Sequence, residues 1–423
     1  MPADRTLPLW AGRTAALLGI FIVAFCLRLS VAALSPIVSF IAHDIPLNPL
    51  VLGIIGAAPP ITFAATGLAT PWLSRRLGLE RALVLAAALM AAGQIIRAVA
   101  PDSVLLVVGT VVSLLGAAIG NVLLPPVVKK YFPDRITQVT TIYAVLISLS
   151  TALPALLAVP LAAAVDWRFS LGIWFVFALI AVVPWVVASV AHLRDAAERV
   201  RNNDPDALES ETRLEGRLFR SPVAWAIMIT FSVSSINVYA FFAWLPSLLV
   251  QTAHVSNGEA GALLALYAIM GFPGSLLVPW LAGRMRNVGI LLYVSLGFLF
   301  VGDAGLLLAP AAAPVLWVAV AGLGPFLFPL ALVLINARTR THRGSVALSG
   351  FVQGVGYIIA AVSPLAFGLL EQATGSWTLS LCFLFVLSLA TIPAGIILSR
   401  GHYLEDELAR RRAGRSRETA NGN

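Results

Sequence analysis

The sequence predicts an all-α membrane protein with twelve transmembrane helices, arranged as two parallel repeats of six helices. Three observations lead to this prediction. The 423-residue chain is 59% hydrophobic but only 11% charged, whereas soluble proteins carry about 25% charged residues. Apolar runs of the roughly 20 residues that cross a bilayer recur along its whole length. Short motifs of the first half return, slightly altered, in the second half.

The membrane spans are predicted from apolar runs bounded by charged and turn-forming residues, and several are long enough to tilt. Pro and Gly interrupt some runs, as in GAAPPITF (56–63) and GNVLLPPVV (120–128). Such breaks are tolerated in a membrane where neighbouring helices satisfy the freed backbone groups. The twelve predicted spans are 14–42, 50–73, 81–100, 102–128, 137–165, 168–191, 222–251, 258–282, 287–310, 312–337, 343–370 and 376–399.

The positive charges predict the topology. If both termini face the cytoplasm, all of the 28 Lys and Arg residues except Arg28, Arg97 and Arg168 fall in cytoplasmic segments, as the positive-inside rule requires. We place Arg97 and Arg168 in outer segments. The rule also explains the net charge of +8 without a nucleic-acid partner. We therefore predict a multi-pass protein of the cell (inner or plasma) membrane, with no signal peptide ahead of its first long span.

Internal echoes predict a duplication. PWLSRR (71–76) returns as PWLAGR (279–284), and WRFSL (167–171) returns as WTLSL (377–381). A long polar stretch, 192–221, has six spans on each side, so both halves start on the same side of the membrane and the repeat is parallel. This is the arrangement of the major facilitator fold, in which substrate binds near the midplane between the halves. The predicted parts are a cytoplasmic N-terminus (1–13), a six-helix bundle (14–191), a cytoplasmic linker (192–221), a second six-helix bundle (222–399) and a cytoplasmic tail (400–423).

Arg28 is the strongest candidate for a functional residue, because it is the one charge between Thr14 and Ala42. An arginine stays protonated, and at the centre of a membrane helix it costs at least about 2.5–3.5 kcal/mol. It must therefore face water, an acidic partner or an anionic solute, and its paired donors suit flat anions. We predict that Arg28 binds substrate. The alternative is an arginine that bonds helix carbonyls or extends to the lipid surface.

The seventh predicted span supplies further polar and aromatic candidates. The offset of 208 residues that relates PWLSRR to PWLAGR places Ile236 opposite Arg28 in the repeat. Asn237 is next to Ile236, so both halves have a polar group at similar depth. Tyr239 and Trp244 follow along the same span. We predict that all three contact substrate, although Asn237 serves equally well as a hydrogen bond to a neighbouring helix.

Three more candidates come from other spans. Gln353 and Tyr357 lie four residues apart, on one face of the eleventh span, with glycines nearby that let helices approach closely. Their alternative role is to join helices. Asn121 lies in the fourth span near two prolines, where it either contacts substrate or caps carbonyls that the prolines free.

Titratable groups are sparse in the predicted spans. Asp303 is the one acid placed inside a span, so it is the candidate carrier of a coupling proton; its alternative is a helix end or a lipid-interface residue. Cys26 and Cys382 lie in apolar runs and are expected to pack as small hydrophobes. The chain has no GxxxxGK[ST], HExxH or CxxC motif, so we expect no ATP hydrolysis, no metal, no cofactor and no enzyme activity.

Longer stretches resemble a known family. GNVLLPPVVKKYFP, WRFSLGIW, YAFFAWLPSLL and LSGFVQGVGYIIAAVSPLAFGLLEQATGSW are similar to the cyanate/nitroimidazole transporter branch (CynX/NimT-type) of the major facilitator superfamily. The resemblance implies uptake or efflux of a small planar anion or nitro-heterocycle. The family's first-span motif reads CLRLS (26–30) here, which keeps Arg28 but not the asparagine and proline around it. The loop at 67–83 resembles the superfamily's gating motif without its acidic residue.

These features together predict a monomeric secondary active transporter that moves a small, anionic or planar electron-rich solute by alternating access. Its expected partners are the solute, the lipid bilayer and a coupling proton. Two other functions stay open at this point. One is a broad-specificity drug exporter in which Arg28 is structural, which would also accept cations or neutral lipophiles. The other is a membrane sensor that transports nothing, which would need a larger soluble output domain than the short basic tail.

Overall fold

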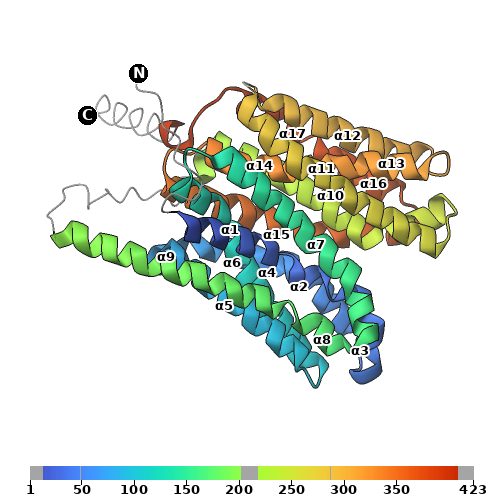
Figure 1. The fold of residues 1–423 in the computed structure, drawn as a ribbon. Helices are drawn as coiled ribbons and strands as arrows, with labels where there is room; N and C mark the ends of the chain where they lie inside the picture. Colours follow the sequence, from blue (N-terminus) through green and yellow to red (C-terminus); the bar gives the residue numbers. More distant parts are fainter. Residues whose placement is uncertain (1–12, 48, 202–217, 286, 408–423) are drawn as a thin grey trace, which may run out of the picture. The chain divides into compact units, whose positions relative to one another are not determined.

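The computed structural model describes residues 13–47, 49–201, 218–285 and 287–407, and within these ranges every regular element is a helix (Figure 1). The chain divides into two compact units, residues 1–215 and 216–423. Among the described residues, eleven helical segments are long and apolar enough to span a bilayer. The remaining predicted span, the second (50–73), lies within one further helix, α4 (Pro49–Leu77). The prediction of an all-helical membrane fold is confirmed.

Unit 1 contains the first six spans. Its helices are α1 (Thr14–Cys26), α2 (Leu29–Ala32), η1 (Ser35–Ile37), α3 (Val38–Asp44), α4, α5 (Leu79–Ala98), α6 (Ser103–Tyr131), α7 (Ile136–Ala164), α8 (Trp167–Gly172) and α9 (Phe175–Arg201). The turn from α4 to α5 uses Gly78 at φ = 84°, a left-handed conformation that favours glycine. Asp102 begins α6, because its carboxylate accepts the Leu105 N–H at 2.8 Å.

The first predicted span of unit 1 is broken in the structure, and the sixth is followed by further helix. The first predicted span, 14–42, is one apolar run, but the structure divides it into α1, α2, η1 and α3. The sixth predicted span ends at 191, whereas α9, drawn in green, continues to Arg201 as a single long helix (Figure 1). The apolar part of this segment ends at Ala191, as predicted, and the helix continues beyond it through more polar residues. Much of the predicted linker, 202–217, lies outside the described residues.

Helices α5 and α6 pack tightly in unit 1 because small residues lie at their interface. A Cβ on Gly109 would stand 2.8 Å from the backbone nitrogen of Arg97, and one on Gly116 would stand 2.7 Å from that of Met90. No side chain fits into such spaces without moving a helix. Close approach through glycine is typical of helix pairs in membranes, where packing replaces the hydrophobic effect.

Unit 2 contains the other six spans. Its helices are η3 (Leu218–Arg220), α10 (Pro222–Thr252), α11 (Asn257–Arg284), α12 (Gly289–Leu308), α13 (Pro314–Leu323), η4 (Gly324–Phe326), α14 (Leu327–Ala337), α15 (His342–Thr374), α16 (Thr378–Ser388) and α17 (Thr391–Ser399). Hydroxyl caps begin three of the long helices: Ser221 for α10, Ser256 for α11 and Thr341 for α15. The tenth predicted span is divided into α13, η4 and α14, and the twelfth into α16 and α17.

The centre of unit 2 is the pair formed by α10 and α15, which pack along each other. Ser234 of α10 donates to the carbonyl of Pro325 at 3.2 Å, where α13 gives way to η4. Ser363 of α15 donates to the Ile236 carbonyl at 3.1 Å. Hydroxyl groups therefore satisfy carbonyls at this helix crossing and beside the break in the tenth span, as a bilayer requires.

Candidate functional site

Arg28 lies where the first span is broken. Because α1 ends at Cys26 and α2 begins at Leu29, residues 27 and 28 leave the regular helix. The Arg28 side chain is half-buried, and its guanidinium carbon lies 5.4 Å from the centre of the Phe63 ring on α4. A cation over an aromatic face is attracted by the ring. Unit 1 thus holds a permanent positive charge, beside an aromatic side chain, within a membrane span.

A second arginine of unit 1 is inside the bundle, which corrects the prediction that placed Arg97 in an outer segment. Arg97 belongs to α5, and none of its surface is exposed. The side chain donates from Nη1 to the carbonyl oxygen of Ser30 at 3.1 Å and to Oε1 of Gln94 at 3.2 Å. A signal for this was present in the sequence: Gln94 and Arg97 are three residues apart, so they share one face of a helix.

Asn121 lies inside the bundle of unit 1. It is 3% exposed on α6, four residues before Pro125. The helix continues through Pro125 and Pro126 without interruption. Both roles considered for Asn121, contact with substrate and capping of freed carbonyls, stay predictions.

The structure brings two of the predicted aromatic residues of unit 2 together. Tyr239 on α10 and Tyr357 on α15 have ring centres 6.4 Å apart, in an edge-to-face arrangement. Tyr357 also packs edge-to-face on Phe231 at 4.9 Å. Tyr357 is buried and Tyr239 is half-buried. The two tyrosines therefore form one aromatic surface at the α10–α15 crossing, with Tyr239 as its more accessible member.

Asn237 and Gln353 are fully buried in unit 2. The Asn237 amide donates to the Val233 carbonyl at 2.9 Å and to the Ser388 hydroxyl at 3.4 Å, so it joins α10 to α16. Gln353 donates to the Ser349 hydroxyl one turn earlier at 2.9 Å. The Asn237 bonds match the alternative in which this residue joins helices. The Gln353 bond is a contact within α15.

Trp244 occupies a packing position in unit 2. Its indole N–H donates to the Pro364 carbonyl at 2.8 Å, which satisfies the tryptophan's one donor. Its ring packs on Trp377 with ring centres 5.9 Å apart. A Cβ on Gly368 of α15 would stand 2.9 Å from the indole Cε2. The structure therefore gives Trp244 a role in joining α10 to α15 and α16.

Asp303 is buried inside α12 and is only 1% exposed. Neither carboxylate oxygen has a hydrogen-bond partner among the described residues. The helix continues five residues further, to Leu308, so Asp303 is not the helix cap considered as an alternative. A buried carboxyl group without partners is strongly disfavoured in its charged form. Such a group is suited to holding a proton.

An acidic residue that the sequence analysis overlooked lies at the end of unit 1 where α4 meets α5 and α6 meets α7, which we call its basic end. Glu80, 3% exposed at the start of α5, accepts from Lys130 Nζ at 2.6 Å and from the Tyr131 hydroxyl at 2.7 Å. The stretch 67–83 was expected to lack the acidic residue of a gating motif. The structure shows that Glu80 joins α5 to the end of α6 at this position.

Two exposed carboxylates outside the spans of unit 1 join segments distant in sequence. The Trp167 indole and the Arg168 guanidinium donate to Asp44 at 2.8 Å and 2.7 Å, and these bonds lower the pKa of Asp44. At the basic end, Arg13 donates to Asp134 at 2.7 Å and thereby lowers the pKa of that carboxyl group. These pairs stabilise helix ends and are not candidate solute contacts.

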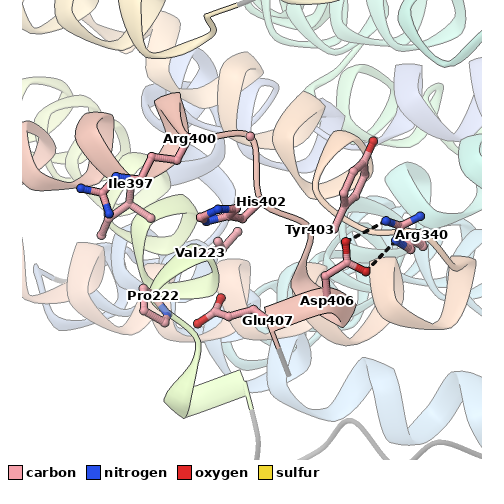
Figure 2. Close-up of a pocket in the computed structure, with 10 residues that line it drawn as sticks. Pro222, Val223, Arg340, Ile397, Arg400, His402, Tyr403, Asp406 and Glu407 are labelled. Carbon is pink, nitrogen blue, oxygen red and sulfur yellow. Dashed lines mark hydrogen bonds and ion pairs between the residues drawn. The ribbon is translucent and has the colours of Figure 1, made fainter. Parts of the chain in front are cut away.

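A pocket of about 510 Å³ lies in unit 2 where α17 ends and α10 begins. Figure 2 shows the Arg340 guanidinium paired with the Asp406 carboxylate at one side of the pocket, with Tyr403 beside them; the two hydrogen bonds measure 2.9 Å and 2.7 Å. Glu405 accepts from the backbone N–H groups of Arg340 and Thr341. The pocket contains none of the predicted solute contacts. The first residues of the tail therefore bind the ends of the unit 2 helices.

The sequence profile of the Major Facilitator Superfamily matches residues 20–364. The 2-nitroimidazole transporter of Escherichia coli (strain K12) is 31% identical over 387 residues, which cover 90% of this chain and 94% of that protein. The cyanate transport protein CynX of the same organism is 26% identical over 369 residues, 87% and 92% of the two chains.

Solved structures agree on the fold. The proton:xylose symporter XylE is similar with a TM-score of 0.70 and 14% identity, over 94% of this chain and 98% of that one. The Major Facilitator Superfamily transporter FucP, in its outward conformation, is similar with a TM-score of 0.66 and 14% identity, over 92% and 98% of the two chains. At such identity the likeness supports the arrangement of helices and not the solute.

Proposed function

Since this chain belongs to the Major Facilitator Superfamily of membrane transporters, we propose that it carries a small anionic or planar, electron-rich solute that binds to Arg28. The observation that carries the proposal is the half-buried guanidinium at the broken first span, beside the Phe63 ring. A fixed arginine offers paired N–H donors to a flat anion, and an aromatic ring offers a surface to a planar one. The relatives named for cyanate and for 2-nitroimidazole support solutes of this size and shape.

In unit 2 we propose Tyr239 and Tyr357 as solute contacts, since their rings lie together and Tyr239 keeps part of its surface accessible. That Asn237, Gln353, Trp244 and Asn121 also contact the solute stays a prediction; their alternative role is to hold the other contacts in place. For Asn237 and Trp244 this role is supported by their hydrogen bonds to other helices.

We propose that Asp303 carries the coupling proton, because it is a buried carboxyl group without a hydrogen-bond partner among the described residues. Transport then consists of solute binding, a change of access and the release of solute together with a proton. We also propose that the protein works as a monomer in the inner or plasma membrane. The placement of its Lys and Arg residues supports cytoplasmic termini.

Ligand-dependent thermal stability of the purified protein tests the role of Arg28. A ligand that binds the folded state raises the unfolding temperature by mass action. We expect cyanate or a 2-nitroimidazole to stabilise the wild-type protein and not Arg28→Gln, whereas Arg168→Gln, which removes an exposed arginine of the same unit, keeps the response. Equal shifts in the wild type and Arg28→Gln would contradict the proposal.

A lipophilic cation in the same panel tests the alternative function. If it stabilises the wild type and Arg28→Gln alike and no anion acts, the protein is a broad exporter and Arg28 is structural. The solute identified in this way then tests Asp303 in vesicles with an imposed pH gradient. We expect Asp303→Asn to exchange solute across the membrane but not to accumulate it, and proton-driven accumulation by this variant would refute the coupling role.

A further inference from the structure

Arg28 is not the only charge at the break in the first span, because the buried Arg97 also reaches it. Ser30 lies two residues after Arg28 on α2, a helix of only four residues. About 5–6 Å separates residues two apart on a helix, so what holds Ser30 also restricts the backbone of Arg28. Ser30 is 2% exposed.

Three side chains from two other helices hold Ser30. Arg97 of α5 donates to its carbonyl oxygen at 3.1 Å. Gln94 of α5 donates to its hydroxyl at 3.2 Å, and its hydroxyl also bonds to that of Ser113 on α6. These four residues, which we call the Ser30 cluster, are each at most 2% exposed. They connect the broken segment of the first span to the rigid α5–α6 pair.

The α5–α6 pair is built to keep the Ser30 cluster in place. A Cβ on Gly93 would collide with the Ser113 backbone, and one on Gly109 would stand 2.9 Å from Arg97 Cγ. The stem of Arg97 is therefore confined against α6, and its guanidinium is directed toward α2. Glycine at both positions lets α5 and α6 approach so closely that the Arg97 side chain has little room to shift.

The buried charge of Arg97 is only partly satisfied by its two hydrogen bonds. Its Nε and Nη2 atoms have no hydrogen-bond partner among the described residues, and no described carboxylate forms an ion pair with it. Burying a guanidinium that is only partly satisfied is costly, and charged residues inside membrane spans are as a rule functional. The charge is placed against the one short segment that carries Arg28.

Arg97 itself does not bind the solute, since none of its surface is accessible. We infer instead that Arg97 is a positioning residue: with Gln94 and Ser113 it holds Ser30, and through Ser30 it holds the broken segment so that Arg28 presents its guanidinium to the solute. The inference depends on the proposed role of Arg28. Its consequence for the fold, that Arg97 holds the segment between α1 and α2 against α5 and α6, does not depend on that role.

A thiol two residues before Arg28 reports the state of the break without any ligand. Cys26 is the last residue of α1, is 2% exposed and is not bridged. The second cysteine, Cys382, is replaced by serine so that only Cys26 reacts. The rate of Cys26 alkylation by N-ethylmaleimide is then measured in full-length protein in detergent for the Cys382→Ser parent, Arg97→Lys, Arg97→Met and the control Arg168→Met.

We expect Arg97→Met to react about tenfold faster or more, because a buried thiol reacts through local opening and the variant loses charged hydrogen bonds that oppose it. Arg97→Lys keeps a donor and reacts near the parent rate, as does Arg168→Met. An Arg97→Met protein that is folded but alkylated at the parent rate would overturn the inference. If Arg97→Met does not fold, Gln94→Leu replaces it, and an unchanged rate in Gln94→Leu has the same meaning.

A second readout separates positioning of Arg28 from simple support of the fold. Cyanate or 2-nitroimidazole, whichever stabilises the wild type, is titrated against each variant. Arg97→Met should need about tenfold more ligand for the same thermal shift, Arg97→Lys should recover most of the affinity, and Arg168→Met should match the parent. Faster alkylation with unchanged affinity would refute the link to Arg28. Failure of the Arg28 proposal shows itself separately, as binding that survives in Arg28→Gln.

Discussion

Glu80 and Lys130 form an ion pair whose contribution is set by burial, and its coupling energy tests that reasoning. The Nζ to Oε1 distance is 2.6 Å, and the two side chains are 22% and 3% exposed for Lys130 and Glu80. At an effective dielectric constant of about 20, two charges this close attract each other by roughly 6 kcal/mol. The partial exposure of Lys130 lets solvent screen about half of this attraction, so we expect a coupling of about 2–3 kcal/mol.

A double-mutant cycle measures this coupling. Glu80→Gln, Lys130→Met and the double variant are unfolded by increasing fractions of a denaturing detergent, and the free energies of unfolding are compared with that of the wild type. Arg340 and Asp406 serve as the matched control, because their atoms are also close, at 2.7 Å, but their side chains are 56% and 41% exposed. Their coupling should stay below about 1 kcal/mol. Equal couplings in the two cycles, or less than about 1 kcal/mol for Glu80 and Lys130, would refute the argument from burial.

Two further predictions concern packing and pH. Gly109→Ala should lower the free energy of unfolding by about 1–3 kcal/mol, because the new methyl group meets the Arg97 backbone; in Gly297→Ala, whose Cβ meets nothing within 4 Å, unfolding scans should show no loss. The lowered pKa of Asp44 means that its bonds stabilise the fold fully above the ordinary value of about 3.9. The stability difference between the wild type and Asp44→Asn should therefore be constant above about pH 5 and shrink as the pH falls through the folded pKa; a difference that grows in acid contradicts the assignment.

The residues of the candidate site that the sequence could indicate are single charges inside apolar runs. Arg28 was identified because a charge in the middle of an apolar run is expensive wherever the run goes. Asp303 was chosen for the same reason; the structure buries it, and its coupling role stays a proposal. Arg97 was misplaced because it lies near the end of a run, where residues that point into the bundle and residues that point to water have the same sequence environment.

Partners could not be predicted where they come from helices far apart in the chain. Gln94 and Ser113 bind Ser30 across 64 and 83 residues of sequence, and nothing in the local pattern of Ser30 indicates either of them. Trp244 was predicted as a solute contact because it is an aromatic residue of the seventh span. Its hydrogen bond to Pro364 could not be predicted, because it depends on how α10 and α15 face each other. Glu80 was overlooked because its pairing with Lys130 appears only when α5 and α6 lie side by side.

Composition, span length and the placement of Lys and Arg were sufficient to predict an all-helical membrane transporter fold, because a bilayer imposes these features on every helix that crosses it. The rotation of each helix about its axis was decided only by packing. Helices that are apolar on all sides have no polar stripe to show which face points inward. Glycine contacts, hydroxyl caps and buried hydrogen bonds between distant helices set that rotation, and with it the surroundings of Arg28.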